Sequence, residues 1–247
     1  KANTAYHFFS GYGADITITP STTELNKAVA KCKYDPEQTL TLGADGSWTN
    51  MGQAYMLSYR RTDIVQNVDL HFKPIMTTVE IDITGATKTD EKIRSIVITI
   101  PKEQNVIYST KENLSENAQL KDATAYFDYN IVGNTDGATF SGNVVKGWET
   151  DNTKFNSGKD ETITFNLATS QSISDTEPLK ITAILPPIKI DGNNPIGITV
   201  YSTDGSNTKS FSGRVDISKK VVIKTDAWKS TRPITTDNDY VDLGLPS

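Results

Sequence analysis

The chain has 247 residues, 36% of them hydrophobic and 22% charged, so it can bury a sizeable core without a metal or a disulfide. Its net charge of -5 argues against nonspecific nucleic-acid binding, which needs clustered Lys and Arg. The sequence contains no run of about 20 apolar residues that could span a bilayer as a helix. The N-terminus carries no basic and then apolar leader, which indicates a mature or trimmed chain.

Alternating apolar and polar residues predict β-strands along most of the chain. In chain order, the alternating segments are residues 15–19, 55–59, 68–72, 79–83, 96–100, 125–132, 162–167, 179–185, 196–201, 211–217 and 221–225. β-Branched residues dominate these segments, and polar clusters rich in Gly, Asn and Asp separate them. Because the helical crossovers that parallel sheets need are lacking, the pattern predicts an all-β chain built of antiparallel β-sandwiches.

At most one or two short helices are expected. Ser21 and Glu24 have the spacing of a capping box after Pro20. Apolar residues that would share one helical face then follow: Leu25, Ala28, Val29 and Cys32. Asp35 and Pro36 end this pattern after about two and a half turns. A weaker helical turn is predicted at residues 111–121, where a long loop suits the composition equally well.

Two alternating segments meet at Pro74 with opposed registers. In residues 68–72 the apolar side chains take even positions, whereas in residues 79–83 they take odd positions, so one flat strand cannot bury both sets. Proline lacks a ladder donor and is tolerated at sheet edges and bulges. We therefore expect a bulge, a bend or a change of sheet at Lys73-Pro74, and a domain boundary near Asn67.

This boundary divides the chain into three predicted parts. Residues 1–66 are expected to form an N-terminal β domain with the short helix, and residues 67–234 a C-terminal β-sandwich domain. Residues 235–247 are expected to form a tail or a linker to a missing domain, because they are polar and acidic as far as Tyr240.

The residues that carry catalysis or bind metals form no recognisable motif. His71 alternates with Leu70 and Phe72, which favours the outer face of a strand over a catalytic base, and His7 belongs to no catalytic arrangement. Cys32 is the only cysteine and is expected to be a small buried side chain. We therefore predict no enzyme activity, no cofactor and no metal site.

Two features leave binding functions open. Asp- and Asn-rich loops at residues 135–137, 191–194 and 237–239 offer oxygen ligands for Ca²⁺, but they lack EF-hand spacing, and turn formation accounts for them more simply. The three tryptophans stand among polar turn residues, where such rings usually cap a core and can otherwise stack on sugars: Trp48, Trp148 and Trp228. If the protein binds a glycan, Trp148 is the predicted contact.

The segment VDLHFKPIMTTVEIDI at residues 68–83 resembles a strand pattern of fimbrillin-like surface proteins of Gram-negative gut and oral anaerobes. The matching residues are Val68, Leu70, Phe72, Met76, Val79 and Ile81. Residues 46–48 and 55–59 resemble the segment that precedes this strand in the family, and residues 181–187 and 196–201 resemble later strands. The resemblance covers about residues 48–228.

The match departs from the family at one position, because Pro74 replaces the usual histidine or His71 supplies it from a displaced position. Independently, DYVDLGLPS at residues 239–247 resembles the opening of a further repeated domain of surface proteins from the same bacteria. The resemblance implies two transthyretin-like antiparallel β-sandwich domains. It also implies export to the cell surface or outer membrane, with membrane contact only through a lipid anchor outside this chain.

The function that the resemblance implies is non-enzymatic adhesion by a fimbrial (pilus) subunit, or a tip or anchor component, assembled by strand addition. Its partners would be other pilus subunits or surface ligands of host or bacteria, and not nucleic acid. In strand addition an extended segment completes the ladder at an exposed edge or groove. The tail is the candidate donor, with Tyr240, Val241 and Leu243 as anchors. The alternatives are a non-polymerising surface lipoprotein that binds glycan or host protein, and a secreted glycan-acting hydrolase.

Overall fold

A computed structural model describes most of the chain: residues 5–63, 67–86, 92–110, 118–122, 125–133, 145–147, 155–174, 176–188, 190, 193–202, 209–212, 220–226, 235–237 and 240–242. Within these residues the only helical segments are single turns of 3-10 helix: η1 (Met51–Gln53), η2 (Lys102–Gln104) and η3 (Leu120–Asp122). The fold is an all-β sandwich, as the sequence predicts.

The strands form three sheets, which we name A, B and C. Sheet A has the order β1 (Tyr6–Tyr12), β6 (Met56–Thr62), β7 (Lys73–Pro74). Sheet B has the order β10 (Ser109–Thr110), β11 (Ala125–Gly133), β3 (Lys27–Tyr34), β2 (Ile16–Pro20), and β12 (Val145–Gly147) also pairs with β11. Sheet C has the order β16 (Lys209–Ser212), β15 (Gly197–Ser202), β9 (Ile93–Ile100), β13 (Glu161–Gln171), β4 (Glu37–Leu42), β5 (Trp48–Thr49), β14 (Leu179–Leu185), β8 (Thr77–Ala86), β17 (Lys220–Asp226), β19 (Tyr240–Asp242), β18 (Thr235–Asp237).

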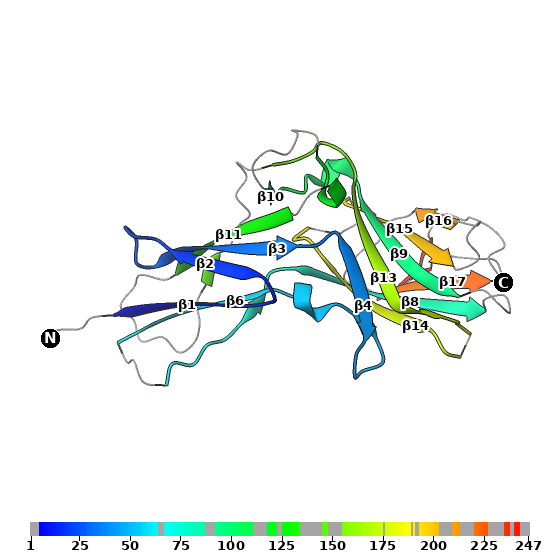
Figure 1. Cartoon of the computed structure of the whole chain (residues 1–247), viewed down its shortest axis with the longest axis horizontal. Coiled ribbons are helices and arrows are strands. Elements are labelled where there is room, and N and C mark those ends of the chain that lie inside the picture. Colours follow the sequence, from blue (N-terminus) through cyan, green and yellow to red (C-terminus); the bar gives the residue numbers. More distant parts are fainter. Residues whose placement is uncertain are drawn as a thin grey trace.

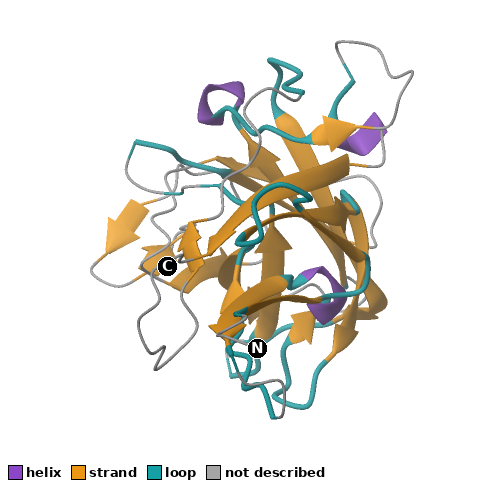
Figure 2. Cartoon of the chain, turned by 90° about the vertical axis from the view of Figure 1, so that its left-hand side faces the viewer, coloured by secondary structure: helices purple, strands orange, loops and turns teal. Residues whose placement is uncertain are grey.

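Sheets A and B lie at one end of the molecule and sheet C at the other (Figure 1). Seen from the end that holds sheets A and B, the strands surround the interior (Figure 2). The chain alternates between the two ends: β1–β3, β6–β7 and β10–β12 build A and B, and the strands between and after them build C. Strands from both sides of Asn67 therefore pair in every sheet, and this pairing does not separate residues 1–66 from the rest.

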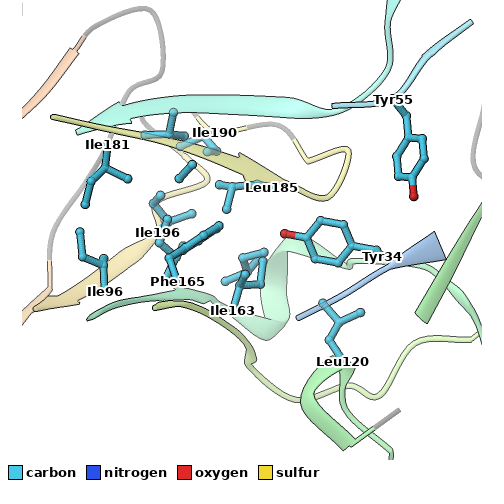
Figure 3. Close-up of a cluster of buried hydrophobic side chains, with 14 of the residues drawn as sticks. Tyr34, Tyr55, Ile96, Leu120, Ile163, Phe165, Ile181, Leu185, Ile190 and Ile196 are labelled. Atoms are coloured by element: carbon cyan, nitrogen blue, oxygen red, sulfur yellow. The ribbon is translucent and has the colours of Figure 1, made fainter. Parts of the chain in front are cut away.

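Alternate burial explains why these segments are strands. In β9 the side chains of Ile96, Ile98 and Ile100 are fully buried, whereas Val97 and Thr99 face outward. β13 repeats the pattern, and its register places Ile163 opposite Ile98 and Phe165 opposite Ile96. These side chains meet Ile181 and Leu185 of β14 in one apolar cluster (Figure 3), which is the core of sheet C.

The predicted helix after Ser21 is absent, and residues 27–34 form β3 instead. The Ser21 hydroxyl accepts a hydrogen bond from the N–H of Glu24 at 3.0 Å, as in a capping box. The Lys27 N–H then donates to the Glu24 carbonyl oxygen, which closes a turn between β2 and β3. The capping interaction is therefore correct, but it stabilises a turn and not a helix.

Residues 27–34 form a strand because their buried side chains repeat every two residues. Every second side chain is buried: Ala28, Ala30, Cys32 and Tyr34. The helical face that the sequence suggested is broken up, because Leu25 and Val29 are 69% and 41% exposed. As a strand, residues 27–34 place all four of these side chains in the core. The predicted helical face would instead have grouped Ala28 and Cys32 with Leu25 and Val29.

Residues 68–72 form no strand in the described chain, which corrects another prediction. Leu70 and Phe72 were expected in the core but are 36% and 38% exposed. Pro74 lies in the two-residue edge strand β7, opposite Met56, and the next strand begins at Thr77 in sheet C. Of the three predicted possibilities at Lys73-Pro74, a bulge, a bend or a change of sheet, the structure shows a change of sheet, between Pro74 and Thr77. The alternation in residues 68–72 does not produce burial, because none of the described strands pairs with this segment.

Buried tyrosine hydroxyls connect separate parts of the fold. Tyr34 of β3 donates a hydrogen bond to the carbonyl oxygen of Ile184 in β14 at 2.7 Å, which links sheet B to sheet C. Tyr129 of β11 donates to the carbonyl oxygen of Ile75, between β7 and β8, at 3.2 Å. Each hydroxyl thus satisfies a buried backbone acceptor outside its own sheet.

Candidate functional site

Two of the predicted tail anchors lie on one short strand. Tyr240 and Val241 belong to β19, where they pair in parallel with Lys220 and Val221 of β17. β18 pairs antiparallel with β19 on its other side, so the tail ends sheet C as a two-stranded ribbon. Leu243, the third predicted anchor, lies outside the described residues, as does Trp148. The predicted donor segment thus forms a strand that adds to the sheet of its own chain.

The parallel direction of these ladders has a structural consequence. β17 also runs parallel to β8, with Val221 opposite Ile81 and Ile223 opposite Ile83. Parallel neighbours cannot be joined by a tight hairpin, so each needs a long connection. The ladder between β17 and β19 therefore fixes register and direction, but it does not by itself require that β19 come from the same polypeptide.

His7 is hydrogen-bonded to a tyrosine, an interaction that the sequence did not indicate. The Nδ1 atom of His7 lies 2.7 Å from the Tyr59 hydroxyl oxygen. The ring of Phe9 also packs against the ring of Tyr59, with the two ring centroids 5.2 Å apart. Burial, followed by the positive charge of Arg61, lowers the pKa of His7. His71, in contrast, is exposed in the segment before β7. The hydrogen bond and ring contacts around His7 join β1 to β6.

A buried carboxylate is the second polar feature that the sequence did not indicate. Glu161, at the start of β13, is 3% exposed. Its Oε2 accepts the N–H of Leu120 at 2.7 Å, and its Oε1 accepts the Ser157 hydroxyl at 2.6 Å. The Tyr108 hydroxyl is farther from Oε1, at 3.3 Å, and has a shorter contact of 2.7 Å with the Ala118 carbonyl oxygen. Glu161 therefore anchors η3 and the start of β13, which is a structural role.

Cys32 is fully buried in β3, as the sequence predicts. Burial, with a smaller effect of Asp128, raises the pKa of its thiol to about 12. The thiolate that nucleophilic chemistry needs is therefore essentially absent at neutral pH. Trp48 in β5 is 7% exposed and belongs to the core cluster, which confirms the core interpretation for this tryptophan. Trp228 lies outside the described residues.

Among the described residues, no group of three or more His, Cys, Asp or Glu side chains is arranged to hold a metal ion. Most of the Asp- and Asn-rich loops considered for Ca²⁺ lie outside those residues. None of the helical turns that the structure describes has the length and apolar character of a membrane span.

Comparisons with protein-family models, with curated proteins and with solved structures found no match. The resemblance to fimbrillins thus stays a prediction from the sequence.

Proposed function

We propose that the protein is a non-enzymatic adhesion protein of the bacterial cell surface, and that it serves as a fimbrial subunit or a tip or anchor component assembled by strand addition. The observation that carries the proposal is the parallel ladder between the tail strand β19 and β17. The similarity of residues 68–83 to the fimbrillin strand pattern supports the same assignment.

The ladder supports exchange between subunits because its donor is short and belongs to the two-stranded ribbon that ends sheet C. It spans three residue pairs, with Val241 opposite Val221 and Asp242 opposite Val222. A tail from a neighbouring subunit could make the same backbone hydrogen bonds at the edge of β17. Because donor and acceptor are different surfaces, such contacts are heterologous and would build a linear polymer.

The test separates the tail from its acceptor edge. A chain that ends at Ile234 is mixed with a synthetic peptide of residues 235–247, and binding is followed by calorimetry or by fluorescence of a labelled peptide. We expect the peptide to bind, and we expect light scattering to detect assembly of the full chain but not of the shortened chain. The matched control is the same peptide with Val241→Pro, which removes a ladder N–H from the centre of β19.

Assembly of the shortened chain at the level of the full chain, or equal binding of both peptides, would contradict strand addition through the tail. The glycan-binding alternative has its own readout. It would be favoured if the full chain stays monomeric and binds a glycan array in a manner that Trp148→Ala abolishes.

A further inference from the structure

The strand β1 is an edge of sheet A. Among the described residues it pairs with β6 alone, from Tyr6 opposite Thr62 to Tyr12 opposite Met56. None of its seven residues, YHFFSGY, is buried. Because no second strand of the described chain pairs with its outer side, the backbone N–H and C=O groups there form an open ladder, which is a template for another strand.

The other sheet edges of the described chain carry features that oppose pairing. β2 ends in Pro20, β7 consists of Lys73 and Pro74, and β16 contains Lys209. β10, β12 and β18 have two or three residues each. β1 is the longest of these edges, and it has no proline and no Lys, Arg, Asp or Glu. It thus lacks the devices that keep edge strands apart.

The outward face of β1 is aromatic. His7 and Phe9 contact the ring of Tyr59, and that ring lies against Gly133 of sheet B, so the odd positions face inward. The even positions therefore face outward, and Tyr6 and Tyr12 are 45% and 56% exposed. The solvent face of an antiparallel sheet is usually polar, so exposed aromatic side chains here indicate a contact surface.

The sequence of β1 is complementary to itself. If two copies of the strand run antiparallel about Phe9, then Tyr6 of one lies opposite Tyr12 of the other, twice, and Phe8 lies opposite Ser10. Aromatic cross-strand pairs stabilise a ladder, and no like charges meet at any position of this register. A strand that pairs with its own copy gives a closed two-fold contact.

We propose that β1 is a self-association edge, on which β1 of a second copy of this chain pairs antiparallel about Phe9. The two copies of sheet A then form one continuous sheet with Tyr6 and Tyr12 from both copies on its outer face. This contact does not use the tail and does not rest on the proposed function. It would also operate in a protein that does not polymerise.

The experiment uses charge pairs at the two exposed tyrosines of the full chain. In a variant with Tyr6→Lys and Tyr12→Lys, two like-charged pairs face each other across the two-fold axis. We expect self-association, measured by sedimentation equilibrium, to weaken about tenfold or more. In a variant with Tyr6→Lys and Tyr12→Glu the pairs attract, so we expect the dimer to persist.

A mixing experiment tests whether the partner of β1 is β1 of a second copy. The variant with Lys at both positions and a variant with Glu at both positions should each be monomeric, and their equimolar mixture should form a mixed dimer. The matched control carries Leu25→Lys and Leu42→Lys, which makes the same change in net charge at exposed apolar positions outside β1, and it should associate like the unmodified chain. Circular dichroism and denaturant unfolding check that each variant folds.

Three outcomes would overturn the proposal. The unmodified chain could be monomeric over the whole accessible concentration range. The Lys variant and the Lys-Glu variant could dissociate equally, which would exclude the two-fold register. The Lys and Glu variants could fail to combine although both are folded, which would mean that β1 binds an occupant other than its own copy.

Discussion

Gly133 of β11 lies against the ring of Tyr59 in β6: a Cβ atom at residue 133 would be 2.0 Å from Cζ of that ring. The backbone of Gly133 is held in place by Asn26, because its N–H donates to the Asn26 carbonyl oxygen at 2.7 Å and its own carbonyl oxygen accepts the Asn26 side-chain amide at 2.9 Å. Sheets A and B therefore meet here at a position that has room for glycine alone.

We expect Gly133→Ala to lower the free energy of unfolding by about 1–3 kcal/mol, because neither the buried ring of Tyr59 nor the fixed backbone can move away without strain. Denaturant unfolding measures the change. The control is Gly197→Ala, where the nearest atom to the added Cβ is 3.4 Å away, an ordinary contact. Equal destabilisation by both substitutions would mean that the approach to Tyr59 is not the cause.

Removing the hydroxyl of Tyr34 tests the link between sheets B and C. Tyr34→Phe leaves the buried Ile184 carbonyl oxygen without this donor, and we expect a loss of about 1–2 kcal/mol in unfolding free energy. The matched control is Tyr55→Phe. The Tyr55 hydroxyl is also buried, but this hydroxyl makes no hydrogen bond of ordinary geometry. The backbone of Asp15 is near enough to affect the pKa of Tyr55. A larger loss for Tyr55→Phe than for Tyr34→Phe would refute this ranking.

Both side-chain oxygens of the buried Glu161 should be needed as hydrogen-bond acceptors. Glu161→Gln keeps the shape but replaces one acceptor oxygen by a donor that faces the Leu120 N–H or the Ser157 hydroxyl. We expect a loss of about 1–3 kcal/mol in unfolding free energy. Glu80→Gln, on the exposed face of β8, makes the same chemical change and should have little effect. Similar losses in both variants would argue against a special role for Glu161.

Acidification should weaken the attachment of β1 through His7. The pKa of His7 is lowered in the folded protein, so the unfolded chain takes up a proton first as the pH falls through about 6.5. Stability therefore decreases with falling pH from that point until folded His7 is protonated as well. His7→Gln should make the unfolding midpoint less sensitive to pH in this range, measured by thermal unfolding in a pH series. An unchanged pH dependence would rule out His7 as its source.

Cys32 should not react with thiol reagents in the native protein, because it is fully buried and the pKa of its thiol is raised to about 12. In denaturant it should react at the rate of a free cysteine. It is the only cysteine, so its reaction with a chromogenic disulfide reports unfolding of sheet B without a background. Rapid native labelling would show that β3 opens locally.

Much of the β-structure follows from local alternation. Strands such as β9, β11 and β13 agree with the pattern because their β-branched and aromatic side chains alternate without a competing helical period. β3 shows the limit of this reasoning, since its four buried positions are two alanines, a cysteine and a tyrosine, and small residues signal burial weakly. β1 was missed for a related reason, because its aromatic residues occupy both faces of the strand.

The polar features could not be predicted because they depend on contacts between distant residues. His7 and Tyr59 are 52 positions apart, and Glu161 and Leu120 are 41 apart. No spacing rule connects such pairs, whereas the capping contact between Ser21 and Glu24 follows a local rule and was found. What that contact stabilises depends on the sheet beyond it, which local rules do not include.

The alternation of the chain between the two ends of the molecule also governs the order in which the fold can form. Tyr34 and its acceptor Ile184 are separated by 150 positions, and β4 pairs with β13 in parallel across a comparable distance. During synthesis, β3 and β4 emerge long before their partners β11 and β13 exist, and such long loop closures make folding slow. Sheets B and C therefore cannot be completed until the second half of the polypeptide has been made. A protease cut between β9 and β10 would leave sheets B and C each divided between two fragments.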